Sequence, residues 1–352
     1  MARAPRPPKS EPTVPSEPDL LDNAPPPREN PHLFGHRSAI ARIVADFAAN
    51  PPQGLLLEGP RGIGKATLAF HLARALLSTV PGRPLPADLA VDPQGRAARQ
   101  VAAGTHPGLL HLMRPWDFKD KRYRRDISVD DVRRIVTFLG STAADGGWRV
   151  VVVDAVDDLN ASSANALLKS LEEPPPRALF VLIAHASGRV LPTIRSRCRA
   201  VRLRPLPDED VRAALTALGA DPRLSQLSDG SVRRALVLAQ AGADAIERAR
   251  RLLSAEALSD PRQHHALAEI AAAKRGELFS VVADLVLDAM AERVRAGAGR
   301  LPLALLDSYA QTYLAAAADR RRVEVFNLDR REVVLELCAR LAAADRAARA
   351  AP

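Results

Sequence analysis

The chain has 352 residues, of which 47% are hydrophobic, 4% aromatic and 26% charged, and its formal net charge is +9 at pH 7. This length allows two or three packed domains, and the small share of aromatic residues predicts an aliphatic and largely helical interior. The two cysteines, Cys198 and Cys338, are isolated in the sequence, which excludes a disulfide framework and a zinc site made of thiolates.

The sequence shows no signal for export or membrane insertion. Its N-terminus lacks the apolar core of a signal peptide, and no stretch reaches the ~20 apolar residues that span a bilayer. We therefore expect a cytoplasmic protein without a membrane partner. The basic charge fits a polyanionic partner, although arginine-rich chains are also common products of GC-rich genomes.

The first 30 residues are rich in Pro, Glu, Ser and Asp. Such a segment cannot bury enough apolar surface to offset the entropy lost on ordering. We predict a disordered tail over residues 1–30.

Residues 31–205 alternate between helical and strand patterns. Apolar runs bounded by turn residues predict buried parallel strands over residues 54–58, 149–153 and 179–184. Apolar residues at helical spacing predict helices over residues 38–49, 67–77, 128–139 and 162–171. This order predicts an α/β domain with a parallel sheet.

After Pro205 the strand patterns stop. Short helices are predicted over residues 208–218 and 231–241, and the chain is helical from about residue 246 onward. We expect a small helical domain over residues 206–245 and an all-α domain over residues 246–352.

A glycine-rich loop follows the first predicted strand. Gly59, Gly62, Gly64 and Lys65 fit the pattern G-x-x-x-x-G-K between a strand and a helix. Glycines allow backbone N–H groups to surround phosphate oxygens, the helix N-terminus adds positive charge, and the lysine reaches the β and γ phosphates. The pattern predicts ATP binding; the alternative is a turn that only packs a helix on the sheet.

The next position places Mg²⁺ in doubt. The hydroxyl that normally holds this ion should follow Lys65, but the residue there is Ala66, and Thr67 comes one position late. One step along a helix turns a side chain by about 100°. Thr67 is therefore a candidate nucleotide-site residue that does not simply replace the missing ligand.

The strand over residues 149–153 ends at Asp154, where a parallel sheet commonly places a metal- or phosphate-site carboxylate. An active ATPase of this kind carries Glu next, to activate the attacking water. Here the residue is Ala155, which cannot accept a proton. Asp157 and Asp158 fit turn chemistry better than catalysis. The site is predicted to bind ATP without efficient hydrolysis.

Two later segments carry a specific resemblance. Residues 165–175 (NALLKSLEEPP) and 191–198 (LPTIRSRC) closely resemble the bacterial clamp-loader AAA+ family, which includes the gamma/tau and delta-prime subunits of DNA polymerase III. Ala155 beside a retained Ser-Arg-Cys element, together with residues 326–330 (FNLDR), resembles the delta-prime members. The resemblance implies that Arg197 is an arginine finger acting on a neighbouring subunit; the alternative is a surface arginine in a basic stretch.

Other segments match the same family. Residues 230–236 (GSVRRAL) resemble its sensor 2 element, which assigns Arg233 to the nucleotide site, and residues 34–36 (FGH) resemble the segment where adenine contacts begin. Residues 104–107 (GTHP) resemble the end of the family's zinc module. The four cysteines of that module are missing, and the region contains Asp92, Gly95 and Ala98 instead. We therefore predict no zinc.

The resemblance implies a role in replication. Such a chain would join gamma/tau and delta subunits in a pentamer that loads a sliding clamp onto primed DNA, with residues 206–245 as the lid and residues 246–352 as the collar. It would lack ATPase activity of its own within the polymerase holoenzyme, a nucleotidyltransferase. The competing predictions are an active gamma/tau-like ATPase and, with less support from the motifs, a P-loop kinase.

A basic segment over residues 114–125 (RPWDFKDKRYRR) is not explained by these motifs. It combines cations with aromatic residues, a pattern that can bind nucleic acid through phosphate contacts and stacking. Its two aspartates dilute the charge. We therefore favour a solvated surface connection over direct contact with DNA.

Overall fold

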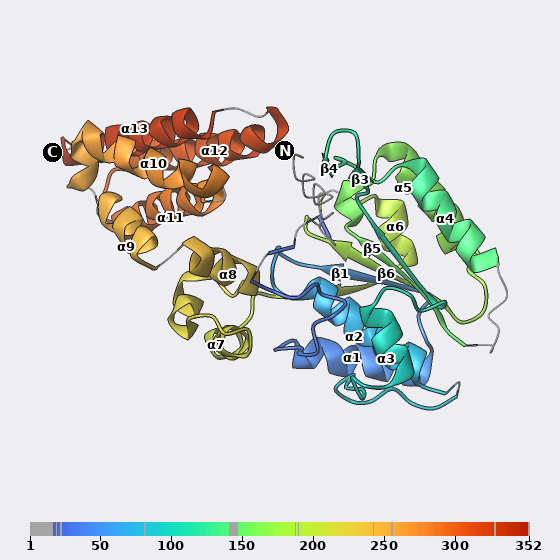
Figure 1. Cartoon of the computed structure of the whole chain (residues 1–352). Coiled ribbons are helices and arrows are strands. Elements are labelled where there is room, and N and C mark those ends of the chain that lie inside the picture. Colours follow the sequence, from blue (N-terminus) through green and yellow to red (C-terminus); the bar gives the residue numbers. More distant parts are fainter. Residues whose placement is uncertain are drawn as a thin grey trace, which may run out of the picture. The chain divides into compact units, whose positions relative to one another are not determined.

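The computed structural model describes residues 17–18, 20–21, 23–80, 82–140, 147–186, 188, 190–241, 243–254, 256–276, 278–326 and 329–350. The chain divides into two compact units, Met1–Arg233 and Arg234–Pro352, which are coloured blue to yellow-green and yellow to red in Figure 1. The first unit contains the sheet, and the second is helical.

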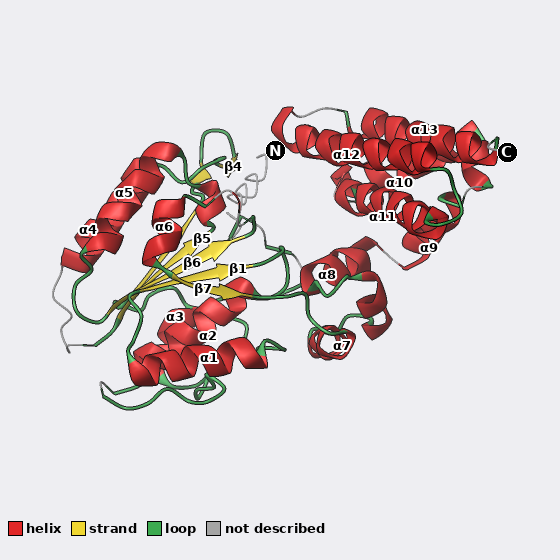
Figure 2. Ribbon diagram, turned by 180° about the vertical axis from the view of Figure 1, so that it is seen from behind, coloured by secondary structure: helices red, strands yellow, loops and turns green. Residues whose placement is uncertain are grey.

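The first unit is built on a five-stranded parallel sheet in the order β2-β5-β6-β1-β7 (Figure 2). The strands are β1 (Gly54–Glu58), β2 (Leu109–Met113), β5 (Arg149–Asp154), β6 (Ala178–Ala184) and β7 (Arg199–Arg202). The predicted α/β domain with a parallel sheet, followed by helical residues, is confirmed. Strands β2 and β7 were not predicted from the sequence, and both lie at the edges of the sheet.

Helices cover both faces of this sheet (Figures 1 and 2). One layer contains α1 (Arg37–Ala49), α2 (Lys65–Ser78) and α3 (Arg96–Ala102); the other contains α4 (Val129–Gly140), α5 (Ala161–Glu172) and α6 (Pro192–Arg197). Val150 and Val152 pack in the core beneath the first layer, whereas Val151 and Val153 pack beneath the second. Because successive strand residues face opposite ways, a strand covered on both faces is apolar throughout.

The described chain is helical after β7. Its longer helices are α7 (Asp208–Ala217), α8 (Val232–Ala241), α9 (Ala243–Leu252), α10 (Pro261–Gly276), α11 (Phe279–Gly297), α12 (Leu303–Phe326) and α13 (Arg330–Arg349). None of the helices within the described ranges combines the length and apolar character needed to cross a membrane. Asn327 and Leu328, part of the delta-prime-like segment, lie outside the described residues.

A buried polar network joins three helices of the second unit. Arg293 Nε on α11 donates to both carboxylate oxygens of Asp345 on α13, at 2.7 and 3.0 Å. The hydroxyl of Tyr309 on α12 donates to the same carboxylate at 2.8 Å. Asp345 is only 7% exposed, so its charge depends on these donors, because an unpaired buried carboxylate is strongly destabilising.

Two described residues of the predicted disordered tail contact other parts of the first unit. Arg28 Nε donates to Ala102 O at 3.2 Å, and Arg74 Nη2 donates to Asn30 O at 2.7 Å. In the first bond the tail residue is the donor, and in the second the tail residue supplies the acceptor. Composition alone does not reveal these contacts. The domain boundaries, including the one at residue 31, stay predictions.

Two histidines in the first unit generate a stability prediction. Burial lowers the pKa of both His71 and His111 from 6.5 to about 4. Because the unfolded chain then binds more protons between those values, the stabilisation is complete above about pH 6.5 and is lost as the pH falls toward 4. We expect the melting temperature to fall by a few degrees between pH 7 and pH 5.

Calorimetry of the variant His71→Gln/His111→Gln checks this expectation, since its melting temperature should vary less over the same pH range. The matched control is His265→Gln, at an exposed position of α10. Equal pH dependence in the wild-type protein and the double variant would contradict the assignment.

Candidate functional site

The glycine-rich loop connects β1 to α2 and has a backbone that only glycine accommodates easily. Gly59, Gly62 and Gly64 have φ values of 154°, 78° and 94°. A Cβ atom on Gly59 would lie 2.4 Å from Leu203 O, and one on Gly62 would lie 2.3 Å from Ser231 Oγ. Both the conformation and the close neighbours therefore require glycine.

Lys65, the first residue of α2, lies buried inside this loop. Its Nζ donates to Gly59 O at 2.7 Å and to Pro60 O at 2.5 Å. Burial lowers the pKa of Lys65 to about 8, while the charges of Asp154 and Asp157 oppose that shift. The side chain thus carries a positive charge at neutral pH in a poorly solvated position.

The carbonyl oxygens of the loop all have donors. Those of Gly59 and Pro60 accept from Lys65, and the next four accept as follows: Arg61 O from Ser231 Oγ at 3.2 Å, Gly62 O from Arg233 N at 3.2 Å, Ile63 O from His36 Nε2 at 2.7 Å and Gly64 O from Leu68 N at 2.9 Å. Within the described ranges, the N–H groups of Gly62, Ile63 and Gly64 have no acceptor. A loop whose carbonyls already have donors and whose N–H groups are available suits an anion.

The segment that resembles sensor 2 lies against this loop. Ser231 and Arg233 donate to consecutive loop carbonyls, and Arg233 Cβ would lie 2.5 Å from a Cβ on Gly62. His36 contacts the same loop: as the Nε2–H tautomer it donates to Ile63 O. Burial lowers the pKa of His36. The sequence associated Arg233 and His36 with nucleotide contacts, but it did not reveal these hydrogen bonds to the loop.

Asp154 is the last residue of β5, at the end of the sheet where the glycine loop follows β1. It pairs in register with Ile183, the neighbour of Ala184, and Ala184 pairs with Glu58, the residue before Gly59. Asp154 thus ends its strand level with the start of the loop, with β6 between the two. Its role in the site stays a prediction.

The residue after Asp154 belongs to the core. Ala155 is 2% exposed and packs in the cluster beneath α1 and α2. Asp157 accepts from His185 N at 2.6 Å and from Ala186 N at 2.9 Å, and Asp158 pairs with Arg114 Nε at 3.1 Å. Both aspartates therefore have structural contacts, and neither replaces the missing glutamate by position.

Ala66 and Thr67 occupy the first turn of α2. Ala66 is partly buried against the core beneath this layer. Thr67 is also half-buried, one residue further along the helix. The structure thus offers no hydroxyl at the position that directly follows Lys65.

Arg197, the last residue of α6, lies on the surface. Its Nη2 donates to Glu172 Oε1 at 2.7 Å, and its Nη1 donates to Thr193 O at 3.0 Å. The two charged side chains are 36% and 48% exposed. Its hydrogen bonds are therefore with α5 and within α6, rather than with the glycine loop of this chain.

The neighbouring arginines form ion pairs between secondary-structure elements. Arg195 Nη2 lies 2.7 Å and Arg202 Nε lies 3.5 Å from the carboxylate of Glu58, which is only 2% exposed, and Arg199 pairs with Asp46. These contacts fasten α6 and β7 to β1 and α1. Arg197 differs from them because its carboxylate partner is exposed.

The region that resembles a zinc module contains a hydrogen-bonded turn and buried apolar residues. Gly95 N donates to Asp92 O at 3.0 Å, and the side chain of Asp92 accepts from Gln94 N at 2.9 Å. Ala98 and Val101 are buried. Packing and a hydrogen-bonded turn act together here, and among the residues that the structure describes no cluster of three or more His, Cys, Asp or Glu could hold a metal ion.

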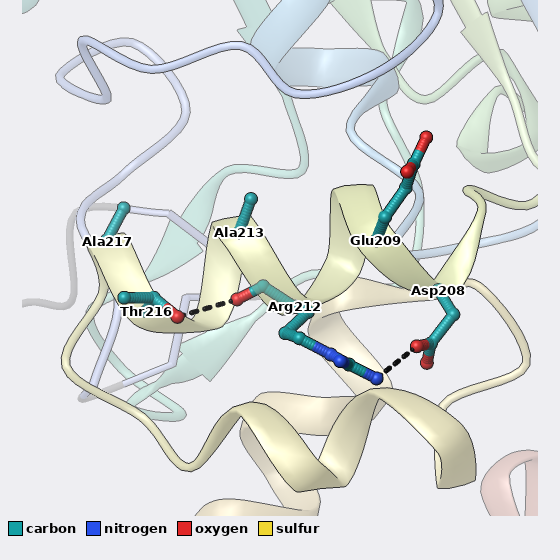
Figure 3. Close-up of a pocket in the computed structure, with 6 residues that line it drawn as sticks. All are labelled: Asp208, Glu209, Arg212, Ala213, Thr216 and Ala217. Atoms are coloured by element: carbon teal, nitrogen blue, oxygen red, sulfur yellow. Dashed lines mark hydrogen bonds and ion pairs between the residues drawn. The ribbon is translucent and has the colours of Figure 1, made fainter.

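A hollow of about 550 Å³ on α7 lies apart from these groups (Figure 3). Figure 3 shows Arg212 directed at Asp208, to which it donates at 2.6 Å, while Thr216 Oγ1 donates to Arg212 O at 2.9 Å. Because these polar groups already satisfy one another and no predicted site residue lines the hollow, it is not part of the candidate site.

The fold and loop define a P-loop α/β domain: a glycine loop between a buried strand and a helix, with a carboxylate at the end of a nearby parallel strand. Residues 36–207 match the family described as "DNA polymerase III, delta subunit". The chain is 36% identical over 222 residues to DNA polymerase III subunit delta' of Pseudomonas aeruginosa, covering 58% of this chain and 63% of that protein. It is 33% identical over 220 residues to the Escherichia coli subunit delta', covering 58% and 60%.

The chain thus spans about three fifths of the length of these curated relatives. A solved structure of a DNA polymerase III gamma subunit-related protein from Thermotoga maritima is 17% identical, with 89% of this chain and 100% of that one covered and a TM-score of 0.44. The family match and the delta' relatives confirm the resemblance to the delta-prime subunits of DNA polymerase III.

The burial of Ala155 generates a prediction about stability. Ala155→Glu places a carboxylate at a core position, so we expect a loss of about 3 kcal/mol in the free energy of unfolding. Urea denaturation measures the loss. Ala213→Glu, the same change at an exposed position of α7, should alter stability by less than about 0.5 kcal/mol. Equal stabilities of the two variants would show that Ala155 is not a core residue in solution.

Proposed function

We propose that this chain is a delta-prime-like clamp-loader subunit that binds ATP, hydrolyses it poorly or not at all, and supplies Arg197 to the ATP site of a neighbouring subunit. The observation that carries the proposal is the contrast between Ala155 and Arg197. The position of the hydrolytic carboxylate is an apolar core position, whereas the arginine of the finger motif is exposed at the end of a helix.

The glycine loop supports nucleotide binding. The available N–H groups of Gly62, Ile63 and Gly64 suit phosphate oxygens, and the ammonium of Lys65 contacts Gly59 and Pro60 of the same loop. A bound polyphosphate would offer this ammonium stronger acceptors than the two carbonyl oxygens it now contacts. The glycine cradle thus fits ATP phosphates, with Arg233 and Asp154 as the other proposed site residues.

The same site is poorly suited to hydrolysis. Ala66 supplies no hydroxyl to a Mg²⁺ ion, Thr67 lies one helical step away, and Ala155 cannot orient water. General-base catalysis needs a carboxylate within hydrogen-bond reach of the attacking water. These substitutions favour a non-hydrolysing subunit over the alternative of a gamma/tau-like ATPase.

The ion pair between Arg197 and Glu172 suits a finger that acts on another chain. A carboxylate presents two oxygens to a guanidinium much as a phosphate does. Exposed pairs of this kind contribute about 1 kcal/mol or less. A γ-phosphate in a neighbouring site could therefore replace Glu172 at little cost, after Glu172 had oriented the side chain.

The proposal includes an assembly. Gamma/tau subunits would provide the ATP site that receives Arg197, and a delta subunit would complete a cytoplasmic pentamer that places a sliding clamp on primed DNA. Support comes from the resemblance to delta-prime subunits. Residues 206–245 would form the lid, and the helical residues 246–352 would act as the collar that joins the subunits.

The finger assignment has a direct test in a reconstituted complex with gamma/tau and delta. We expect Arg197→Ala to lower ATP hydrolysis at the neighbouring site by ~100-fold or more, because a permanently charged donor to the γ-phosphate is lost. Steady-state ATP hydrolysis and clamp loading measure the effect. Arg204→Ala, at an exposed position two residues after β7, is the matched control. Unchanged hydrolysis with Arg197→Ala in an intact complex would refute the role in trans.

Nucleotide binding has a separate test that uses the pKa of Lys65. Phosphate binding requires the ammonium, and a bound polyphosphate raises its pKa, so the free protein must take up a proton to bind once the pH exceeds about 8. We expect the affinity for a fluorescent ATP analogue to fall from pH 8 to pH 9.5.

Lys65→Ala should bind weakly with no such pH dependence, whereas Lys169→Ala, at an exposed position of α5, should behave as the wild-type protein. A wild-type affinity that stays constant up to pH 9.5 would remove Lys65 from the site. ATP turnover by the isolated chain that disappears in Lys65→Ala would favour the ATPase alternative.

A further inference from the structure

The basic segment over residues 114–125 forms a small hairpin. Strands β3 (Trp116–Asp117) and β4 (Arg122–Tyr123) pair antiparallel, with Trp116 opposite Tyr123. The two aromatic rings meet edge to face, with centroids 5.0 Å apart. This contact fixes the stem, since edge-to-face pairs stabilise beyond the area they bury. The surface connection predicted from the sequence thus contains a paired stem.

The stem is attached to the segment that follows β5. Arg114 Nε lies 3.1 Å from Asp158 Oδ2, and Asn160 Nδ2 donates to Asp126 Oδ2 at 2.7 Å. The hairpin leaves the sheet just after β2, whose last residue pairs with Asp154. Figure 2 shows β4 at the end of the sheet toward which the strand arrows point. A short, well-anchored stem thus presents the turn at this edge.

The turn, residues 118–121, presents an aromatic ring and positive charge. Phe118 is 76% exposed, although an apolar side chain of this size gains from burial. The carboxylates that dilute the charge in the sequence have local partners: Asp117 accepts from the backbone N–H groups of Lys119 and Asp120, and Asp120 pairs with Arg122 at 3.0 Å. Within the described part of the chain, Lys119 and Lys121 have no carboxylate partner.

We propose that this turn binds single-stranded nucleic acid, with Phe118 stacking on a base and Lys119 and Lys121 contacting phosphates. Single strands supply both features at once, an unpaired base with an open face and a negative backbone beside it. A duplex offers only the backbone to such a turn, because its bases are already stacked. The inference goes beyond the proposed function, in which this chain needs no contact of its own with nucleic acid.

Fluorescence anisotropy with the full chain tests the proposal, using a labelled 20-nucleotide oligo(dT), an oligo(U) of equal length and a blunt DNA duplex. We expect Phe118→Ala to weaken single-strand binding about tenfold, the lower part of the range for stacking on an aromatic side chain, with little effect on the duplex. We expect Lys119→Gln/Lys121→Gln to reduce the slope of log K against log salt by about 1.4, because two phosphate contacts are lost. The two single-stranded probes distinguish DNA from RNA as the ligand.

Matched controls separate this site from general charge and hydrophobicity. Arg248→Gln/Arg250→Gln removes the same charge from α9, and Tyr313→Ala removes a partly exposed aromatic ring from α12. Both should bind oligonucleotides as the wild-type protein does. The proposal is overturned if the wild-type chain binds neither single strand, if Phe118→Ala binds normally, or if both hairpin variants lose duplex and single strand equally. Because no other subunit is present, these results are independent of the test on Arg197.

Discussion

The close approach between the glycine loop and the segment around Ser231 is the constraint on which the candidate site depends. A Cβ on Gly62 would lie 2.3 Å from Ser231 Oγ, so the two segments can meet only where the loop has no side chain. The approach lets Ser231 and the backbone of Arg233 satisfy two loop carbonyls. With those carbonyls turned outward, the loop N–H groups remain available for an anion.

A second constraint acts through Glu58, the residue just before the loop. Its carboxylate is 2% exposed and lies between Arg195 and Arg202, so loss of either cation would leave much of a buried charge uncompensated. These contacts fix the chain on both sides of Arg197. The segment therefore contains two kinds of arginine: those that hold α6 and β7 in place, and Arg197, whose carboxylate partner Glu172 is exposed.

The sequence alone predicts a strand well where an uninterrupted apolar run marks it. Strands β1, β5 and β6 are apolar runs buried on both faces, and they were predicted closely. Strand β2 (LLHLM) is interrupted by a histidine, and β7 (RAVR) has four residues with arginine at both ends. Neither strand therefore shows a continuous apolar run. The hairpin escaped prediction because its strands have two residues each, and their pairing depends on the contact between Trp116 and Tyr123.

The site shows a similar division. The loop motif predicts Lys65 and the glycines, because phosphate binding demands those residues at that spacing. Contacts between distant positions leave no local trace: Arg197 and Glu172 are 25 residues apart, and Ser231 and Arg61 are 170 apart. The position of Arg233 was expected only through the family resemblance. The role of Glu58 has a faint signal in the sequence, a charged residue that ends an apolar strand.

The loop also has a structural role that does not depend on hydrolysis. Lys65, His36 and Ser231 donate to carbonyls of a single turn from three different segments of the chain. Replacing Lys65 or His36 would leave a part-buried acceptor unpaired, at a cost of about 1–3 kcal/mol. Ala155 carries no such penalty, because a small apolar residue suits a core position. The loop is therefore constrained by the hydrogen bonds of the fold itself, whereas position 155 is constrained by core packing.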